Sequence, residues 1–398
     1  MKKNQLIISL TLTLLINIIP TQNSNIYLKN ENKSKFDVTV VGVIKENDGW
    51  GQLPIRFIKY YKDILKINVI PVLQDIKYLD DDIKQIILDQ DKTPGKVALV
   101  FMQPYSSLVS FLPKSKIKIC YTMTESHYIH KEWVDTLNKH FDATVVPSQF
   151  LVTAYKKAGL KIPIFNLPIG LDLDNYFKAA LKSSPNKIFT FGISANFGND
   201  HNKNQKMLIK SFLKKFKNND NIRLRVRGNW GDKEEIESIK RLITKRDAKN
   251  VEIEIKPLSS QDYLEFMKSL DCYVLVSKGE GFSITPREAL ALGIPCILSN
   301  NTAHKIICKT SYVKSVNLLN IENIAQALEE VYNNYDYYLH KAHQGREWVK
   351  QYTYKSLGNK YLNLIQPKKI ILGPENIITN DYIIINSEAL FHKYSLIK

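Results

Sequence analysis

The chain has 398 residues, of which 44% are hydrophobic and 24% are charged, and it contains only 15 prolines. These values are typical of globular proteins and exclude a wholly disordered or collagen-like chain, while the length favours two domains. Lysine and arginine number 56 against 39 aspartates and glutamates, which leaves a net charge of +17. Such an excess of positive charge is compatible with phosphates, nucleic acid or an anionic membrane surface as the binding partner, and it does not distinguish among them.

The first 24 residues have the pattern of a targeting segment. Lys2 and Lys3 precede an apolar run that Pro20 interrupts. The run is too short for a transmembrane helix and has the length of a secretory h-region, but no small-residue cleavage site follows it. Residues 1–24 are therefore predicted to be a signal-like or anchor segment, and a spurious early start is the alternative.

Residues 34–180 show the pattern of a doubly wound α/β domain. Nearly continuous apolar or β-branched runs, typical of strands covered on both faces, alternate with amphipathic stretches. Ser148 is a suitable N-cap for one of the helices between them. The predicted strands are 38–44, 67–72, 97–101, 117–123 and 143–146.

A second series of the same kind follows a linker at 182–187 that is rich in Lys, Ser, Pro and Asn. We predict a second doubly wound domain over 181–335, then helices over 336–366 that return to the first domain, and a small appendage over 367–398. Two such domains in tandem form a deep cleft, and ligands of these sheets bind beyond the carboxyl ends of the strands. The predicted strands of the second domain are 188–191, 222–226, 251–255, 272–276 and 296–298.

The segment 277–295 carries the clearest chemical signal, because a glycine-rich loop between two predicted strands leads into a helix. Thr285 fits the N-cap of this helix, Pro286 its first residue and Gly293 the residue after its end. A glycine-rich loop before a helix presents free backbone N–H groups and a partial positive charge. The segment therefore predicts an anion site for a diphosphate.

Two carboxylates frame this anion site, Glu280 in the loop and Glu288 in the helix, with seven residues between them. Near a phosphate they would be repulsive unless they accept hydrogen bonds from hydroxyls, which a sugar together with a ribose supplies. The pair therefore indicates a nucleotide sugar. Glu288 also has a structural interpretation, because it follows Thr285 at the spacing of a capping box. Glu280, between two glycines, has no such alternative.

This segment resembles the E-x7-E region of retaining GT-B glycosyltransferases of the group 1, or glycosyltransferase family 4, type. It departs from that family's pattern at Ser283, in place of the second loop glycine, and at Cys296, in place of the closing valine. The resemblance implies a GT-B fold, in which two Rossmann-like, doubly wound parallel-sheet domains face each other across a cleft. It extends over residues 36–367 through Thr124-Glu125, Trp133, Asn138, 141–148, 167–172, Asn202-Lys203-Asn204, Arg346, Trp348, Tyr352 and Tyr354.

The resemblance also implies roles for individual residues. Glu280 would be catalytic by holding hydroxyls of the transferred sugar and favouring positive charge at its anomeric carbon. Lys203 would be catalytic by neutralising the diphosphate leaving group, so that neither a metal nor a cofactor is expected. Glu288 would accept the ribose hydroxyls of the donor. Further donor contacts are expected from the backbone of Gly281, Phe282 and Ser283 and from His127, which follows a predicted strand end.

Two departures from the family concern the phosphate and acceptor sites. The family commonly has an arginine just after the glycine that ends the first strand of the second domain, whereas Gly192 is followed here by Ile193. His201 or Lys206 is the expected substitute for this cation, or the diphosphate is held less tightly. The usual glycine-rich acceptor loop of the first domain is reduced to Gly49-Trp50-Gly51.

Two further polar groups have simpler interpretations. Glu125, His127, His130 and Glu132 lack the spacing of a zinc site and are expected to be hydrogen-bonded or solvent-facing. The four cysteines are far apart, without a CxxC pair, and are expected to be buried thiols.

A row of arginines also has a simple interpretation. Arg223, Arg225 and Arg227 alternate with apolar residues. This is typical of a strand with one polar face, and no nucleic-acid-binding motif accompanies it.

We therefore expect a retaining glycosyltransferase that moves a sugar from a nucleoside diphosphate sugar to a hydroxyl acceptor, such as a glycan or a glycolipid. The alternatives are a nucleotide-sugar epimerase of the same fold and a noncatalytic nucleotide- or glycan-binding protein. The expected partners are the nucleotide sugar, a glycan, lipid-linked or other hydroxyl acceptor and an anionic membrane surface, but no nucleic acid. Because nucleotide sugars are cytoplasmic in bacteria, we expect a cytoplasmic or membrane-associated protein, with export through the N-terminal segment as the alternative.

Overall fold

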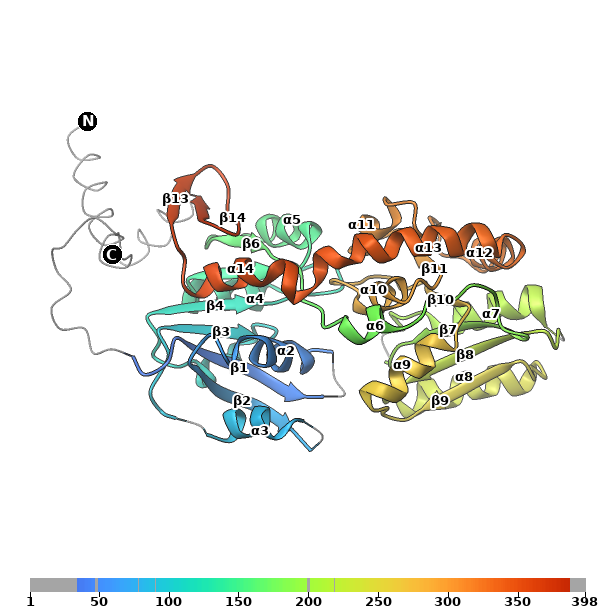
Figure 1. Ribbon diagram of the computed structural model, residues 1–398, viewed down its shortest axis with the longest axis horizontal. Helices are drawn as coiled ribbons and strands as arrows, with labels where there is room; N and C mark the ends of the chain where they lie inside the picture. The colour runs from blue at the N-terminus through green and yellow to red at the C-terminus, as the bar shows by residue number, and fades with distance from the viewer. Residues whose placement is uncertain are drawn as a thin grey trace, which may run out of the picture.

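The computed structural model describes residues 34–46, 49–77, 79–89, 91–198, 201–217 and 219–386. The predicted targeting segment, residues 1–24, lies outside this part of the chain. Two sheets of six strands each, flanked by helices, lie end to end along the longest axis of the molecule (Figure 1). The predicted fold of two doubly wound α/β domains is confirmed.

The first sheet has the strand order β2-β1-β3-β4-β5-β6, and all of its neighbouring strands run parallel. The order reverses between β1 and β3, so the loops after these two strands frame a crevice at the carboxyl edge of the sheet. The strands are β1 (Val38–Lys45), β2 (Ile67–Asp75), β3 (Val97–Phe101), β4 (Ile117–Tyr121), β5 (Ala143–Val146) and β6 (Ile164–Asn166). The helical segments are α2 (Gln52–Tyr61), α3 (Asp81–Leu88), η1 (Ser106–Phe111), α4 (Lys131–His140) and α5 (Gln149–Lys157).

The second sheet has the order β12-β11-β10-β7-β8-β9 and is also parallel throughout. Its order reverses between β7 and β10, which places the loops that contain Lys203 and Glu280 at the same crevice. The strands are β7 (Phe189–Ser194), β8 (Ile222–Gly228), β9 (Val251–Ile255), β10 (Cys272–Leu275), β11 (Cys296–Ser299) and β12 (Lys314–Val316). The helices are α7 (Gln205–Phe216), α8 (Lys233–Lys245), α9 (Ser260–Lys268), α10 (Ile284–Ala291), α11 (His304–Cys308) and α12 (Ile321–Asn333).

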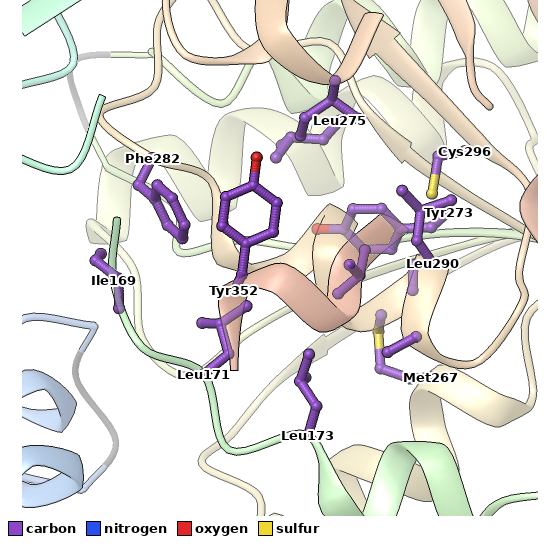
Figure 2. Packing of buried hydrophobic residues seen from close by; sticks show 14 of the residues in the cluster. Ile169, Leu171, Leu173, Met267, Tyr273, Leu275, Phe282, Leu290, Cys296 and Tyr352 are labelled. Carbon is purple, nitrogen blue, oxygen red and sulfur yellow. The ribbon is translucent and has the colours of Figure 1, made fainter. Parts of the chain in front are cut away.

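Two chain segments connect the domains, and they are hydrogen-bonded to each other. The first passes through 167–173 into α6 (Asp174–Lys178), and the second passes from α13 (Tyr335–Val349) through η2 (Lys350–Tyr352) to α14 (Tyr354–Ile365). Leu171 N donates to Tyr352 O at 2.8 Å, and Tyr354 N donates to Leu171 O at 3.3 Å. Figure 2 shows the first segment beside Tyr352 and Phe282 at this junction.

The two helices of the returning segment belong to different domains. α13 packs along α10 of the second domain, whereas α14 packs on the first domain. Tyr61 Oη donates to Gly358 O at 2.9 Å, and Tyr361 Oη donates to Pro168 O at 2.9 Å. The chain therefore crosses back to the first domain only after Val349.

A small sheet follows α14, made of β13 (Ile370–Gly373), β14 (Ile377–Ile378) and β15 (Ile383–Asn386). Asn363 of α14 donates to Thr379 O at 2.9 Å and so fixes this sheet to the first domain. In the described part of the chain, no helix is long and apolar enough to cross a membrane. The four cysteines are free thiols, and three of them are buried as expected, whereas Cys308 is partly exposed.

Candidate functional site

A cleft of about 1590 Å³ lies between the two domains, at the carboxyl edges of both sheets. The first domain contributes residues from the loop after β1, from α2 and from 123–126, and the second contributes both crevice loops and the start of α9. The predicted site residues that line it are Gly49, Trp50, Lys203, Glu280, Gly281, Phe282, Ser283 and Glu288.

The loop before α10 differs in one respect from its prediction. The helix begins at Ile284 with Ser283 as its N-cap, so the prediction of Thr285 as N-cap and Pro286 as first residue was wrong. Ser283 adopts a left-handed backbone (φ 69°) that the sequence pattern does not reveal. Pro286 is tolerated at the third helical position because the first four N–H groups have no acceptor within the helix. Gly293 follows the helix end as predicted, and its backbone is left-handed (φ 71°).

The earlier helix start removes the structural interpretation of Glu288. As the fifth residue of α10, Glu288 is too far from the N-cap for a capping box. Its carboxylate instead accepts a hydrogen bond from Tyr263 Oη at 3.1 Å and lies 3.8 Å from Arg56 Nη2 of the first domain. Glu288 is 6% exposed, and burial raises its pKa above the ordinary value against the opposing effects of Arg56 and Tyr263.

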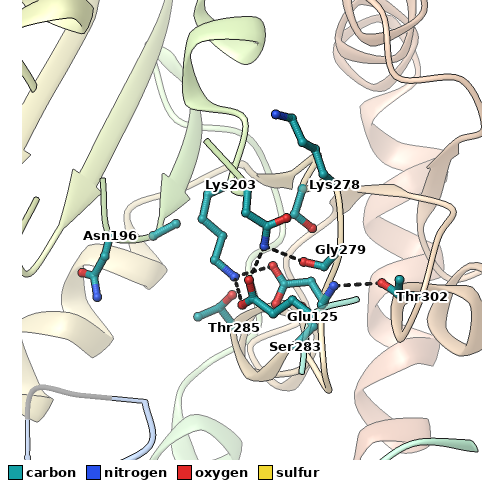
Figure 3. A network of polar contacts seen from close by, with 12 residues as sticks. Glu125, Asn196, Lys203, Lys278, Gly279, Ser283, Thr285 and Thr302 are labelled. Atoms are coloured by element: carbon teal, nitrogen blue, oxygen red, sulfur yellow. Dashed lines mark hydrogen bonds and ion pairs between the residues drawn. The ribbon is translucent and has the colours of Figure 1, made fainter. Parts of the chain in front are cut away.

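Lys203 lies between two carboxylates from different domains (Figure 3). Its Nζ is 2.8 Å from Glu280 Oε1 and 2.7 Å from Glu125 Oε1. Burial favours a lower pKa for Lys203, but the charges of Glu280 and Glu125 outweigh it and raise the pKa above the ordinary value. Lys203 is therefore a fixed cation at neutral pH, positioned for negative charge that enters the cleft.

Backbone contacts fix Glu280 and hold the domains close at this point. Glu280 is 6% exposed, and its N–H donates to Thr302 Oγ1 at 2.8 Å. Asn202 Nδ2 donates to Gly279 O at 2.9 Å. A Cβ at Gly279 would lie 1.9 Å from Glu125 O, so this position requires glycine. The carboxylate of Glu280 is thus held by a loop that fits directly against the first domain.

Carbonyl groups of the loop are turned away from the anion site. Gly281 O accepts from Ser148 Oγ at 2.8 Å, and Ser283 O accepts from Arg287 Nη1 at 2.8 Å. Because a trans peptide places the next N–H opposite the carbonyl, these contacts orient the N–H groups of Phe282 and Ile284 in the other direction. In the described part of the chain, the N–H groups of Gly281, Phe282 and Ser283 donate to no backbone or side-chain acceptor.

Two buried residues support this loop, and sequence reasoning missed both. Arg287, 1% exposed, stacks on the Phe282 ring at 3.9 Å and on the Tyr352 ring at 4.5 Å. His304 Nδ1 lies 3.2 Å from Ser299 O, which can only accept, so its Nε2 accepts from Ser283 Oγ at 2.7 Å. Burial, with the charges of Arg287 and Lys203, lowers the pKa of His304 to about 3. The sequence feature that could have pointed to Arg287 is its position directly before Glu288.

The two residues expected to replace the family's arginine, His201 and Lys206, do not line the cleft. His201 Nδ1 lies 3.1 Å from Glu235 Oε2, and Lys206 Nζ also bonds Glu235, so neither lines the cleft. Arg56 of α2 and Arg227 of β8 line it instead. Arg227 was expected only as part of a polar strand face, but the structure buries it.

The other residues considered in the sequence analysis lie apart from one another. His127 does not reach the cleft, because its exposed ring packs edge-on against Phe150 at 5.2 Å. Glu132 accepts from Ser106 N at 2.8 Å, and the His130 ring contacts Trp133. The considered group of Glu125, His127, His130 and Glu132 is thus dispersed, and no cluster of metal-ligating side chains occurs in the described ranges. Gly51 is the N-cap of α2 and does not line the cleft beside Gly49 and Trp50.

Comparison with known proteins gives a family for the second domain. Residues 185–348 match the family model described as glycosyl transferases group 1. No curated protein sequence matches the chain significantly. The family match covers both crevice loops of the second sheet and therefore includes Lys203, Glu280 and Glu288.

Solved structures extend the likeness to both domains. Anabaena HepE in complex with UDP-glucose has a TM-score of 0.66 at 13% identity, over 82% of this chain and 99% of that chain. S. aureus TarM in complex with fondaparinux, alpha-GlcNAc-glycerol and UDP has a TM-score of 0.55 at 15% identity, over 68% and 55%. An E. coli structure titled as trehalose-6-phosphate bound with UDP-2-fluoro glucose has a TM-score of 0.54 at 9% identity, over 68% and 73%.

At these identities the structural likeness establishes the fold, and the family match establishes the class of enzyme. The resemblance inferred from the sequence is confirmed in both respects. The roles of the individual site residues stay predictions. The protein is a glycosyltransferase of GT-B fold, and its residues 185–348 match the model of the group 1 glycosyl transferases.

Proposed function

We propose that the protein transfers a sugar from a nucleoside diphosphate sugar to a hydroxyl acceptor with retention of configuration at the anomeric carbon. The observation that carries this proposal is the arrangement of Lys203, Glu280, Glu288 and the loop N–H groups in one cleft. HepE with UDP-glucose and pneumococcal GtfA with UDP and GlcNAc, as their structures are titled, support a nucleotide sugar as the donor.

The donor binds along the second domain in the proposed complex. Its ribose hydroxyls donate to the Glu288 carboxylate, and hydroxyls of the transferred sugar donate to Glu280. Its diphosphate lies against Lys203 and the N–H groups that lead into α10. Without donor, Glu280 and Glu125 compensate the Lys203 charge, so phosphate binding replaces ion pairs that already exist.

The bond between the anomeric carbon and the phosphate oxygen breaks as positive charge develops on the sugar. The departing diphosphate takes the proton of the acceptor hydroxyl, and the acceptor oxygen forms the new bond on the same face. Lys203 and the loop N–H groups stabilise the negative charge on the departing oxygens, and Glu280 favours the positive charge at the anomeric carbon. In this scheme the protein supplies the electrostatic stabilisation itself, so we propose that no metal or other cofactor is required.

The acceptor enters from the first domain, past Trp50 and Lys59, which line the cleft opposite the anion site. TarM with alpha-GlcNAc-glycerol and fondaparinux, as titled, supports a glycan or other polyol as acceptor. The net charge of +17 favours an acceptor at an anionic membrane surface. Co-sedimentation of the full chain with anionic vesicles, compared with neutral ones, tests the last point, and equal binding to both would contradict it.

Transfer assays with a panel of nucleotide sugars and polyol acceptors test the proposal. We expect release of a nucleoside diphosphate together with a product whose anomeric configuration, read by NMR coupling constants, equals that of the donor. Glu280→Gln should abolish most of this transfer, whereas Glu237→Gln, an exposed carboxylate paired with Lys240 on α8, should not change it. A product of inverted configuration would contradict retention, and isomerised donor without transfer would indicate the epimerase.

A further inference from the structure

Arg227 is a buried cation that has no carboxylate partner in the part of the chain that the structure describes. It is 2% exposed and lines the cleft near the end of β8. Its guanidinium donates to three neutral acceptors, Ser194 Oγ at 3.0 Å, Asn229 Oδ1 at 2.8 Å and Lys256 O at 2.9 Å. Its Nε is buried and has no acceptor. Burial lowers the pKa of Arg227, and the charge of Glu254, which forms no ion pair with it, offsets this effect only in part.

The other two arginines on the same face of β8 are compensated. Arg223 Nη1 lies 3.2 Å from Glu252 Oε1, and Arg225 Nε lies 3.3 Å from Glu252 Oε2. Glu254 of β9 is the register partner of Arg227, but its carboxylate pairs with Lys256 at 2.8 Å. Of these three arginines, Arg227 is therefore the one that lines the cleft and the one that forms no ion pair with a described residue.

Contacts place Arg227 beyond Glu288 rather than beside Lys203. The Tyr263 ring lies 5.7 Å from the Arg227 guanidinium carbon, and the Tyr263 hydroxyl donates to Glu288. Lys203 instead contacts Glu280. In a nucleoside diphosphate the ribose separates the base from the phosphates. A ribose on Glu288 with phosphates at Lys203 therefore directs the base toward Arg227.

We propose that Arg227 reads the nucleobase of the donor by donating a hydrogen bond to a ring carbonyl, and so selects uracil or guanine over adenine. The inference rests on the proposed function, because it assumes that Glu288 binds the ribose. A guanidinium has only donors, which suit the carbonyl oxygens of uracil and guanine. Adenine presents an amino group where guanine has its carbonyl, so two donors would oppose each other. A ligand that leaves a buried hydrogen-bond donor of the site without an acceptor binds much more weakly than a ligand that supplies the acceptor.

Calorimetric titration of the full chain with UDP, GDP and ADP tests this inference. We expect wild-type protein to bind UDP or GDP at least about tenfold more tightly than ADP, as a hydrogen bond to a charged donor predicts. Arg227→Met should reduce this ratio to near one and leave the affinity for ADP almost unchanged. Arg225→Met is the matched control, because Arg225 lies on the same strand face without lining the cleft, and it should preserve the ratio.

A second titration avoids any change to the protein fold. Wild-type protein is compared for GDP against 2-aminopurine ribonucleoside diphosphate, and for UDP against 2-pyrimidinone ribonucleoside diphosphate, each of which lacks one ring carbonyl. The preferred natural ligand should bind at least about tenfold more tightly than its analogue. This measurement decides the question even if Arg227→Met fails to fold.

The contrary outcomes separate this inference from the proposed function. Equal affinity of wild-type protein for all three diphosphates would overturn base selection alone, and so would tighter binding of ADP. An equal loss for all three in Arg227→Met would assign Arg227 to the phosphates or to the fold. No binding of any of the three would overturn the proposed function and this inference with it.

Discussion

The two faces of the cleft are built in different ways. On the face of the second domain, the carboxylates of Glu280 and Glu288 are buried. Hydrogen bonds hold Glu280 through its carboxylate and its backbone N–H, and Glu288 through its carboxylate. On the face of the first domain, Lys59 is largely exposed, and its one ion pair with a described residue is with exposed Asp172, at 3.2 Å. In the proposed reaction the donor develops the same charges in every transfer, which suits a face whose side chains are held in place. An open face allows the acceptor to change while the fold stays the same.

Removal of the cation that joins the two faces should have the largest effect. Lys203→Met eliminates the charge that stabilises the departing diphosphate, so kcat should fall by about 10²–10³-fold in a transfer assay. Lys214→Gln is the control, because Lys214 lies on α7, the helix that follows Lys203, and pairs with Glu322 outside the cleft. A fall in affinity with kcat unchanged would contradict a role in the transition state.

Acidification should weaken donor binding through the buried carboxylate of the fixed face. The pKa of Glu288 is raised above its ordinary value of 4.5, so the carboxylate takes up a proton at a higher pH than an exposed glutamate. Below that raised pKa, affinity for the nucleotide sugar should fall by up to about tenfold per pH unit. Glu288→Gln should bind weakly without this pH dependence. The linked effect on stability has the opposite sign, because the folded state binds this proton more tightly than the unfolded state.

The second-domain face should also lose stability in acid because of His304. Its folded pKa of about 3 lies below the ordinary value of 6.5, so its contribution is complete above pH 6.5 and is lost as the pH falls toward 3. The slope is at most about 1.4 kcal/mol per pH unit. Urea unfolding at several pH values measures it, and His304→Gln should flatten the curve. An unchanged slope in that variant would assign the acid sensitivity to other groups.

Substitution on the open face should affect the acceptor more than the donor. Trp50→Ala removes an aromatic side chain that lines the cleft from the loop after β1, so the KM for the acceptor should rise about three- to tenfold. The KM for the donor should change less than the KM for the acceptor. Equal changes in both would show that the two faces are not functionally separate.

The smallest expected effect is that of chelation. Because Lys203 and the loop N–H groups supply the positive charge in the proposed reaction, EDTA should leave the transfer rate unchanged within error. Restoration of lost activity by a divalent cation would contradict this part of the proposal.

Local patterns of the sequence predicted the fold and the core of the site. The β-branched runs indicated the strands, and the loop from Gly279 to Ser283 indicated an anion site, which stays a prediction, because its residues are consecutive in the sequence. Arg56, Arg227 and His304 could not be assigned in this way, because their positions depend on contacts between distant segments. The helix start at Ile284 was missed for a similar reason, since His304 and Arg287 hold Ser283 in its left-handed conformation.

The crossing of α14 back to the first domain has a consequence for biosynthesis. Tyr61 and Tyr121 belong to the earliest part of the chain, yet their aromatic neighbours Tyr354 and Tyr361 emerge from the ribosome more than 200 residues later. The second domain needs no such distant partner, because the segment 189–316 forms its sheet and the helices that pack on it, α12 and α13, follow directly in the chain. We therefore expect nascent chains arrested before residue 354 to carry a finished second domain and a first domain that still binds chaperones.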